Sequence, residues 1–196
     1  MNHHGSVNWA MTGLILYFAL AIELGLRGGV TIAQSAAPSL MFAVTACFAV
    51  YAGLWSLLWI AFLAGLLVDL MTPIAPVGMG EAVVVIGPRA LGFMVGAYLV
   101  YLLRGFLFVR NAITITVVGM MGAAAAGVVS LAILQVRSIT DPDILLARPS
   151  LISAMLSAVY SGVPMLLLGL VWRRLLPWLG LSDPSRSRYD RVVVDR

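Results

Sequence analysis

The apolar residues of this chain recur in long, nearly uncharged runs, and this pattern restricts its fold more than any other feature. A run of ~20 apolar residues can cross the ~30 Å hydrocarbon core of a bilayer as one helix. A soluble domain instead needs ~25% charged residues to cover its surface. Here 62% of the 196 residues are hydrophobic and 10% are charged. The sequence therefore predicts an all-α, polytopic integral membrane protein.

Six membrane-spanning helices account for these runs. We expect them at about residues 9–26, 39–54, 57–71, 82–103, 112–134 and 151–176. Only the uncharged stretch GLWSLLW separates the second run from the third, and more than thirty apolar residues are too many for one span. The two runs therefore predict a tight hairpin. Residues 1–177 would form one six-helix bundle, followed by a short arginine-rich cytoplasmic tail over 178–196.

The arginines predict how the bundle is oriented. All twelve cationic residues are arginine, and with the N-terminus inside, eight of them fall on the cytoplasmic side. The opposite side receives Arg27, Arg137 and Arg148, with Arg89 in or beside the fourth span. Cytoplasmic segments are enriched in arginine, so both termini are expected in the cytoplasm. Because topology explains the positive charge, we expect no nucleic-acid partner, and we expect the tail to lie on anionic membrane lipids.

The groups on which most enzymes depend are missing from the expected helices. The two histidines, His3 and His4, precede the first span, and the single Cys47 has no disulfide partner. Lysine, nucleotide motifs and Cys/His clusters are absent from the sequence, so we expect no metal, cofactor or catalysis. Ser161 in the sixth span has no base to activate it, and we expect it to pack or to bond to its own backbone.

Small residues gather on the fourth and fifth runs. Gly92 and Gly96 form a GxxxG pattern, and GMMGAAAAG over 119–127 gives the fifth run a face of little bulk. Such faces let helices approach closely. Two interpretations stay open, namely packing within the bundle and docking of a partner's transmembrane helix. Spans one to three show no convincing similarity to spans four to six, which inverted-repeat transporters would show.

A carboxylate, Asp69, ends the third run in the stretch AGLLVDLMTPIAPVGMGEA, residues 64–82. A charge in hydrocarbon costs ~2.5–3.5 kcal/mol, and a carboxylate at a helix C-terminus opposes the helix dipole. Compensation is expected from Arg89, from N–H groups of the Pro/Gly loop, or from the N-terminus of the fourth helix. The alternative is that Asp69 already lies among the lipid headgroups.

Glu23 and Glu81 fall at the same external end as Asp69. We expect these acids, with Arg89, to form a polar layer that holds the loop over 73–80. Acidic groups at one end alone cannot relay protons through ~30 Å of hydrocarbon, so their expected role is structural.

The same stretch resembles the MreD family of rod-shape-determining membrane proteins. The resemblance rests on Gly65-x-x-x-Asp69 at a helix end, Pro76-Val77-Gly78 after it, GAYLVYLLRGFLF over 96–108 and RRLLP over 173–177. Two features depart from the family pattern. Only Arg104 and Arg110 follow the fourth run, where the family often has several basic residues, and Arg89 follows Pro88.

The resemblance implies a fold similar to the substrate-binding subunits of energy-coupling-factor vitamin transporters, in the bacterial inner membrane. It implies a non-enzymatic scaffold of cell-wall elongation that acts with an MreC-like protein, beside RodA and its partner transpeptidase. The residues expected to shape the structure or its interactions are Gly65, Asp69, Pro76, Gly78, Glu81, Arg89, Gly92 and Gly96.

Two alternative functions remain open. The chain could be a substrate-binding subunit of an energy-coupling-factor transporter, although its first helix lacks the Ala-x-x-x-Ala face typical of those subunits. It could also be an enzyme that handles lipids or wall precursors, which the missing catalytic groups disfavour.

Overall fold

The computed structural model describes residues 7–26, 37–73, 84–105, 112–140 and 151–181. Over these ranges all regular secondary structure is α-helical. The helices are α1 (Trp9–Leu26), α2 (Leu40–Tyr51), α3 (Leu54–Met71), α4 (Pro88–Leu103), α5 (Ala112–Thr140), α6 (Leu151–Tyr160) and α7 (Gly162–Leu175). Only Ser161 separates α6 from α7, so the two follow one another along a single sixth rod.

Four helical segments are long and apolar enough to cross a membrane, namely Trp9–Leu26, Leu54–Met71, Ala112–Arg137 and Leu151–Trp172. The protein is therefore a multi-pass membrane bundle. The apolar helices α2 and α4 are shorter, with 12 and 16 residues. At ~1.5 Å per residue they measure about 18 and 24 Å, less than the ~30 Å core of a bilayer.

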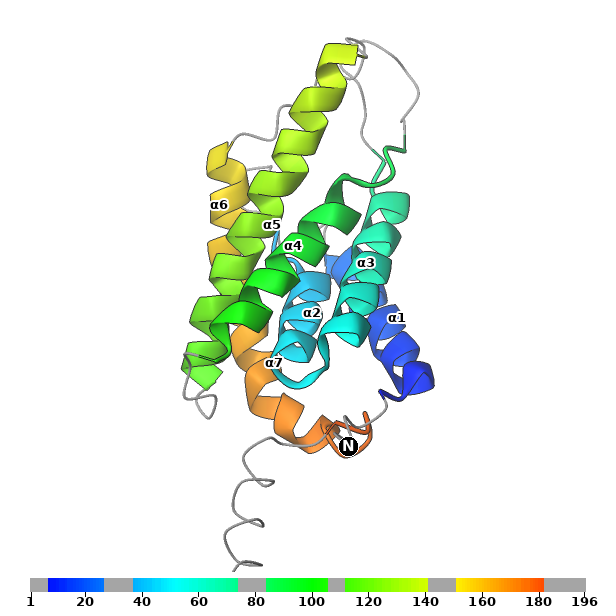
Figure 1. Ribbon diagram of the computed structural model, residues 1–196, viewed down its shortest axis with the longest axis vertical. Coiled ribbons are helices and arrows are strands. Elements are labelled where there is room, and N and C mark those ends of the chain that lie inside the picture. The colour runs from blue at the N-terminus through cyan, green and yellow to red at the C-terminus, as the bar shows by residue number, and fades with distance from the viewer. Residues whose placement is uncertain (1–6, 27–36, 74–83, 106–111, 141–150, 182–196) are drawn as a thin grey trace, which may run out of the picture.

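Consecutive rods alternate in direction, which gathers the helix termini at two opposite ends of the bundle (Figure 1). One end holds the start of α1, the α2–α3 turn and the close of α7. We call it the tryptophan end, because it contains all five tryptophans: Trp9, Trp55, Trp59, Trp172 and Trp178. The opposite end holds Glu23 and Asp69, and we call it the carboxylate end.

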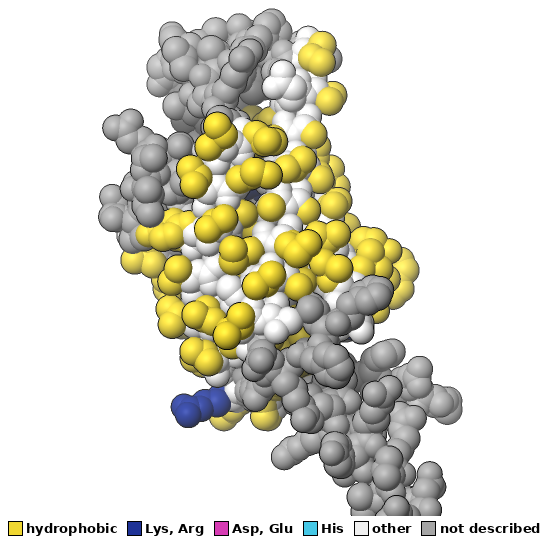
Figure 2. Space-filling model, turned by 90° about the vertical axis from the view of Figure 1, so that its left-hand side faces the viewer, with side chains coloured by type: hydrophobic (Ala, Val, Ile, Leu, Met, Phe, Trp, Pro, Cys, Tyr) yellow, Lys and Arg dark blue, Asp and Glu magenta, His cyan; other side chains and the backbone are white. Residues whose placement is uncertain are grey.

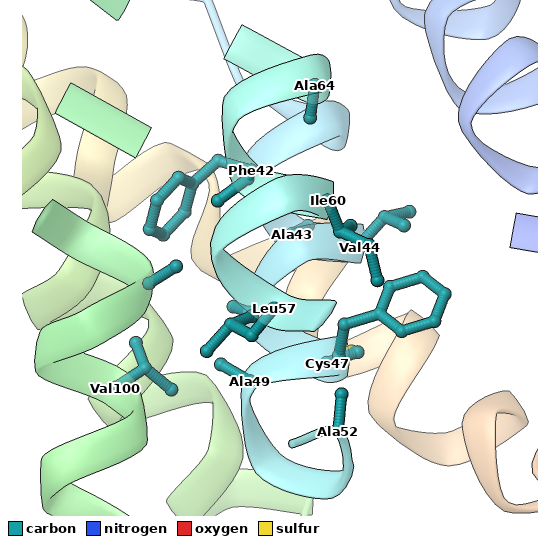
Figure 3. Packing of buried hydrophobic residues seen from close by; sticks show 14 of the residues in the cluster. Phe42, Ala43, Val44, Cys47, Ala49, Ala52, Leu57, Ile60, Ala64 and Val100 are labelled. Carbon is teal, nitrogen blue, oxygen red and sulfur yellow. The ribbon is translucent and has the colours of Figure 1, made fainter. Parts of the chain in front are cut away.

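Helix α2 lies at the centre of the bundle and is buried on all sides from Met41 to Val50. A helix that is apolar all round belongs in an interior. It contacts α1, α3, α4, α5 and α7. Phe42 packs edge-to-face on Phe93 of α4 with ring centroids 5.1 Å apart, and Phe48 packs on Trp172 of α7 at 5.0 Å. Figure 3 shows Phe42 of α2 pointing toward the helix that carries Val100, which is α4.

The outer surface of the bundle is apolar, as a lipid-facing surface requires. Figure 2 shows hydrophobic side chains over the whole described part of one flank. Tyr17 of α1, Ile152 of α6 and Leu167 of α7 are among the exposed large side chains. These residues take the place that charged groups occupy on a soluble protein.

The expected hairpin between the second and third runs is confirmed, since α2 ends at Tyr51 and α3 begins at Leu54. The expected start of the fourth helix at about residue 82 is wrong. Residues 84–86 are not helical, and Gly87 has a φ of 116°, a conformation that favours glycine. Pro88 then begins α4, because its fixed φ and missing N–H suit the first helical position.

Two other expected boundaries differ from the structure. Helix α5 continues to Thr140, whereas hydropathy predicted an end near residue 134. After α7, Leu179 and Leu181 are buried in the bundle, and the carbonyl of Leu179 accepts a 3.1 Å hydrogen bond from the backbone N–H of Asn8. The bundle therefore extends at least to residue 181, beyond the predicted boundary at 177.

Candidate functional site

The carboxylate of Asp69 lies in the last turn of α3 and is 5% exposed. Its Oδ2 accepts hydrogen bonds from the backbone N–H groups of Gly87 at 2.9 Å, Arg89 at 3.1 Å and Ala90 at 3.4 Å. These are N–H groups at the start of α4, which have no partner within their own helix. Of the partners considered for Asp69, the structure thus shows the N-terminus of the fourth helix.

The energies explain why a buried carboxylate is tolerated at this position. The position of the carboxylate at the C-terminus of α3 is unfavourable by ~0.3–1 kcal/mol, and its position at the N-terminus of α4 is favourable by a similar amount. A hydrogen bond to a charged group contributes ~1.5–3 kcal/mol, and Asp69 accepts three from backbone groups that hydrocarbon would leave unsatisfied. The gain therefore exceeds the insertion cost of the charge. Asp69 is a cap for α4, supplied by α3.

Gly65 lies one helical turn before Asp69 and on the same face of α3. A Cβ at this position would lie 2.5 Å from the Cα of Ala90 and 2.6 Å from the carbonyl oxygen of Arg89. Both atoms belong to the backbone of α4, which cannot yield as a flexible side chain would. The pattern Gly-x-x-x-Asp therefore has a physical meaning here. Because Gly65 has no side chain, the first turn of α4 can approach α3 closely. The carboxylate of Asp69 then accepts hydrogen bonds from the N–H groups of that turn.

Arg89 belongs to this junction as well. Its side chain is half-buried, and its Nη1 donates to the hydroxyl oxygen of Thr72, the residue that follows α3. The hydroxyl of Thr72 in turn donates to the carbonyl of Val68 at 2.6 Å. Arg89 thus ties the start of α4 to the end of α3. Three other predicted residues, Pro76, Gly78 and Glu81, lie outside the described residues.

Glu23 is a second cap of the same kind. Its carboxylate is buried on α1, and its Oε2 accepts a 2.8 Å hydrogen bond from the backbone N–H of Met41, in the first turn of α2. Glu23 and Met41 are 18 residues apart in the chain, and so are Asp69 and Gly87. Each short helix thus begins on a carboxylate from the long helix before it. Glu23 and Asp69 share one end of the bundle, as expected, but they hold two different helices.

Ser39 and Ser161 complete the N-terminus of α2. The Oγ of Ser39 accepts from the N–H of Phe42 at 3.2 Å, as an N-cap does. The Oγ of Ser161 accepts from the N–H of Ser39 at 2.8 Å and donates to the carbonyl of Ser157 at 2.7 Å. Ser161 therefore joins the sixth rod to the buried start of α2, which goes beyond the self-contained backbone bond expected from the sequence.

Arg104 occupies the opposite end of α2. Its Nη1 donates to the carbonyl of Ala52 at 2.8 Å, and its guanidinium lies 3.8 Å from the ring centroid of Tyr101. A cation at the C-terminus of α2 and a carboxylate at its N-terminus both interact favourably with the helix dipole. The sequence assigned Arg104 to topology alone and missed this contact, because a pairing 52 residues apart has no local signal.

Gly92 and Gly96 face α5. A Cβ on Gly92 would meet the Ser130 side chain and the Ala126 carbonyl, and a Cβ on Gly96 would meet the Gly122 carbonyl. Ser130 reinforces this contact, since its Oγ lies 3.0 Å from the carbonyl of Pro88. Packing within the bundle is thus what the structure shows. The face is filled by α5, so a partner's helix cannot dock on it.

The arrangement binds backbone groups and joins helices. Within the described ranges, no three His, Cys, Asp or Glu residues lie together in a way that could hold a metal ion. Comparison of the chain with protein-family models, with curated proteins and with solved structures finds no match. The resemblance to the MreD family and the expected likeness to energy-coupling-factor subunits therefore rest on the sequence motifs.

Proposed function

We propose that the protein is a non-enzymatic membrane scaffold of bacterial cell-wall elongation, and that it maintains rod shape with an MreC-like partner. The observation that carries the proposal is the joint between α3 and α4. The two residues at the centre of the family resemblance, Gly65 and Asp69, are the two that make this joint. A motif used to fix helices favours a platform for other proteins over a reaction site.

The contacts of the buried and half-buried polar groups support a non-catalytic role. Glu23, Asp69 and Arg104 each bond to backbone groups at a helix terminus. Ser161 uses its hydroxyl both as an acceptor and as a donor within the bundle. A general base or nucleophile must instead reach a substrate. In this proposal the chemistry belongs to RodA and its partner transpeptidase.

The proposal also restricts where a partner docks. Because Gly92 and Gly96 are buried between α4 and α5, the partner's transmembrane helix must use the outer, lipid-facing surface of the bundle. Helix α1 is peripheral, since its contacts among the described helices are with α2 and α3. Tyr17 and Phe18 are exposed on it. We place the docking surface on α1.

Co-purification tests the proposal. The full chain is expressed with an MreC-like protein and purified in mild detergent, and an unrelated polytopic protein of similar size is the control. We expect the MreC-like protein to co-purify with this chain and not with the control protein. We also expect cells of a strain that lacks the gene to become round, and to become rods again when the full chain is restored. Recovery of a bound vitamin or of ATPase subunits instead would contradict the scaffold and favour a transport subunit.

A further inference from the structure

The tryptophan end gathers the aromatic rings of the bundle that suit a membrane interface. Trp55 is 78% exposed, Trp178 69%, Trp59 57% and Trp9 49%, whereas Trp172 is buried. Exposed indole rings at the ends of spans lie at the level of the lipid headgroups. All five tryptophans of the chain are in the described ranges, so the carboxylate end has none.

Charge is also divided unequally between the two ends. In the described part of the chain, the carboxylate end carries Arg89 and Arg137, which Glu23 and Asp69 balance in number. The tryptophan end carries Arg104, Arg173 and Arg174, and none of its described residues is acidic. The net positive charge of the described residues therefore lies at the end where the indole rings are exposed.

We propose that the tryptophan end binds anionic phospholipid headgroups, with Arg174 as the residue that contacts the lipid phosphate. Arg174 is exposed in the last turn of α7, and Trp178 follows one turn later. Leu179 and Leu181, which follow Trp178, are buried in the bundle and hold this segment against the protein. A guanidinium can bind a phosphate through two parallel hydrogen bonds. An indole at the headgroup level does not compete for that phosphate.

Arg104 has a different part in this surface. The Nη1 of Arg104 already donates to the carbonyl of Ala52, so Arg104 contributes charge to the surface and Arg174 contributes the contact. Figure 2 shows basic atoms at the lower edge of a flank that is otherwise hydrophobic, which is the tryptophan end in that view. The inference does not depend on the proposed role in wall elongation.

Tryptophan fluorescence tests this site, because every indole in the chain reports on the same end. The full chain is reconstituted into vesicles that contain either brominated phosphatidylglycerol or brominated phosphatidylcholine. Bromine quenches nearby indoles, and the ratio of the two quenching curves gives the preference for the anionic lipid. We expect a preference of about fivefold for phosphatidylglycerol, the value for one arginine near an anionic headgroup.

Two charge-removing variants decide whether Arg174 carries the preference. Arg174→Gln should lower it, whereas Arg137→Gln at the carboxylate end should leave it unchanged. Both positions are exposed, so size-exclusion chromatography should show a folded protein in each case. Equal quenching by the two lipids in the wild type would overturn the proposal. So would a preference that Arg174→Gln leaves unchanged, or one that both variants lower equally.

Discussion

The carboxylate of Asp69 accepts a 2.9 Å hydrogen bond from the backbone N–H of Gly87, which stands immediately before α4. The same relationship joins Glu23 to Met41 at 2.8 Å, again across 18 residues. Both buried acids of the described chain are thus explained by helix termini that need an acceptor. Two helices too short to span a bilayer are each fixed to the long helix before them, which lets a small bundle hold a defined shape.

Replacement of Gly65 by alanine should destabilise the bundle by about 1–3 kcal/mol, because the new methyl group would overlap the α4 backbone. The matched control is Gly13→Ala on α1, where a Cβ would meet nothing within 4 Å. That change should be neutral or stabilising by up to ~1 kcal/mol, since alanine favours a helix. Thermal unfolding in detergent compares the two. Equal unfolding temperatures would show that α3 and α4 do not touch at Gly65.

The two carboxylate caps should act on separate helices. Glu23→Leu removes the acceptor from the N–H of Met41, and we expect faster hydrogen exchange in the first turn of α2 but not of α4. Asp69→Leu should show the reverse pattern, and the two variants thus control for each other. Exchange followed by mass spectrometry of peptides from each helix gives the measurement. The same increase at both helices in either variant would argue against two independent caps.

Arg104→Met should loosen the α2–α3 turn, because the carbonyl of Ala52 loses its charged donor and Tyr101 loses its stacked guanidinium. We expect a loss of about 1.5–3 kcal/mol, the contribution of a hydrogen bond to a charged group. Arg174→Met, at an exposed position of the same end, is the control and should change stability little. Denaturant titration of both variants separates a cap from a general effect of charge.

The orientation of the bundle can be tested without altering the native cysteine, because Cys47 is buried in α2. Cysteines are placed at Gly105, just after α4, and at Ile139, near the end of α5. The arginine distribution predicts that an impermeant maleimide labels position 139 in intact cells and position 105 only after permeabilisation. The opposite labelling pattern would reverse the topology, and the unmodified protein shows the background from Cys47.

The sequence was sufficient for the class of fold, since runs of apolar residues report directly on burial in lipid. Hydropathy failed where a short apolar stretch is not a helix. Residues 84–86 are apolar and extended the predicted fourth helix to about residue 82, although Gly87-Pro88 marks its true start. The local conformation of glycine and proline, rather than hydropathy, determines that boundary.

The candidate site was predictable only in part. The position of Asp69 at a helix end indicated that it needed compensation, and the α4 N-terminus was among the partners considered. The role of Glu23 as a cap for α2 was missed. A single carboxylate on α1 gives no local sign that it accepts a hydrogen bond from Met41, 18 residues later in the chain. Spacing alone also could not decide the role of Gly92 and Gly96, since a GxxxG face inside a bundle and one facing a partner have the same pattern.

Asp69 acts chiefly as the hydrogen-bond acceptor that holds the N-terminus of α4, and its negative charge adds to that cap without being required for function. The three amides converge on one carboxylate oxygen, Oδ2, and the amide oxygen of an asparagine can take that position. A leucine offers no acceptor. Asp69→Asn should therefore keep much of the stability and of the rod-shape function, whereas Asp69→Leu should lose both.

The most direct measurement is the thermal unfolding temperature of these two variants in detergent, recorded beside cell shape in a complemented deletion strain. For Asp69→Leu we expect a loss of roughly 3 kcal/mol, which corresponds to a fall of about 6–12 °C for a chain of this size. For Asp69→Asn the fall should be much smaller, and the cells should remain rods. Complete loss of function in both variants with unchanged unfolding temperatures would contradict the account, because the charge itself would then be what the protein requires.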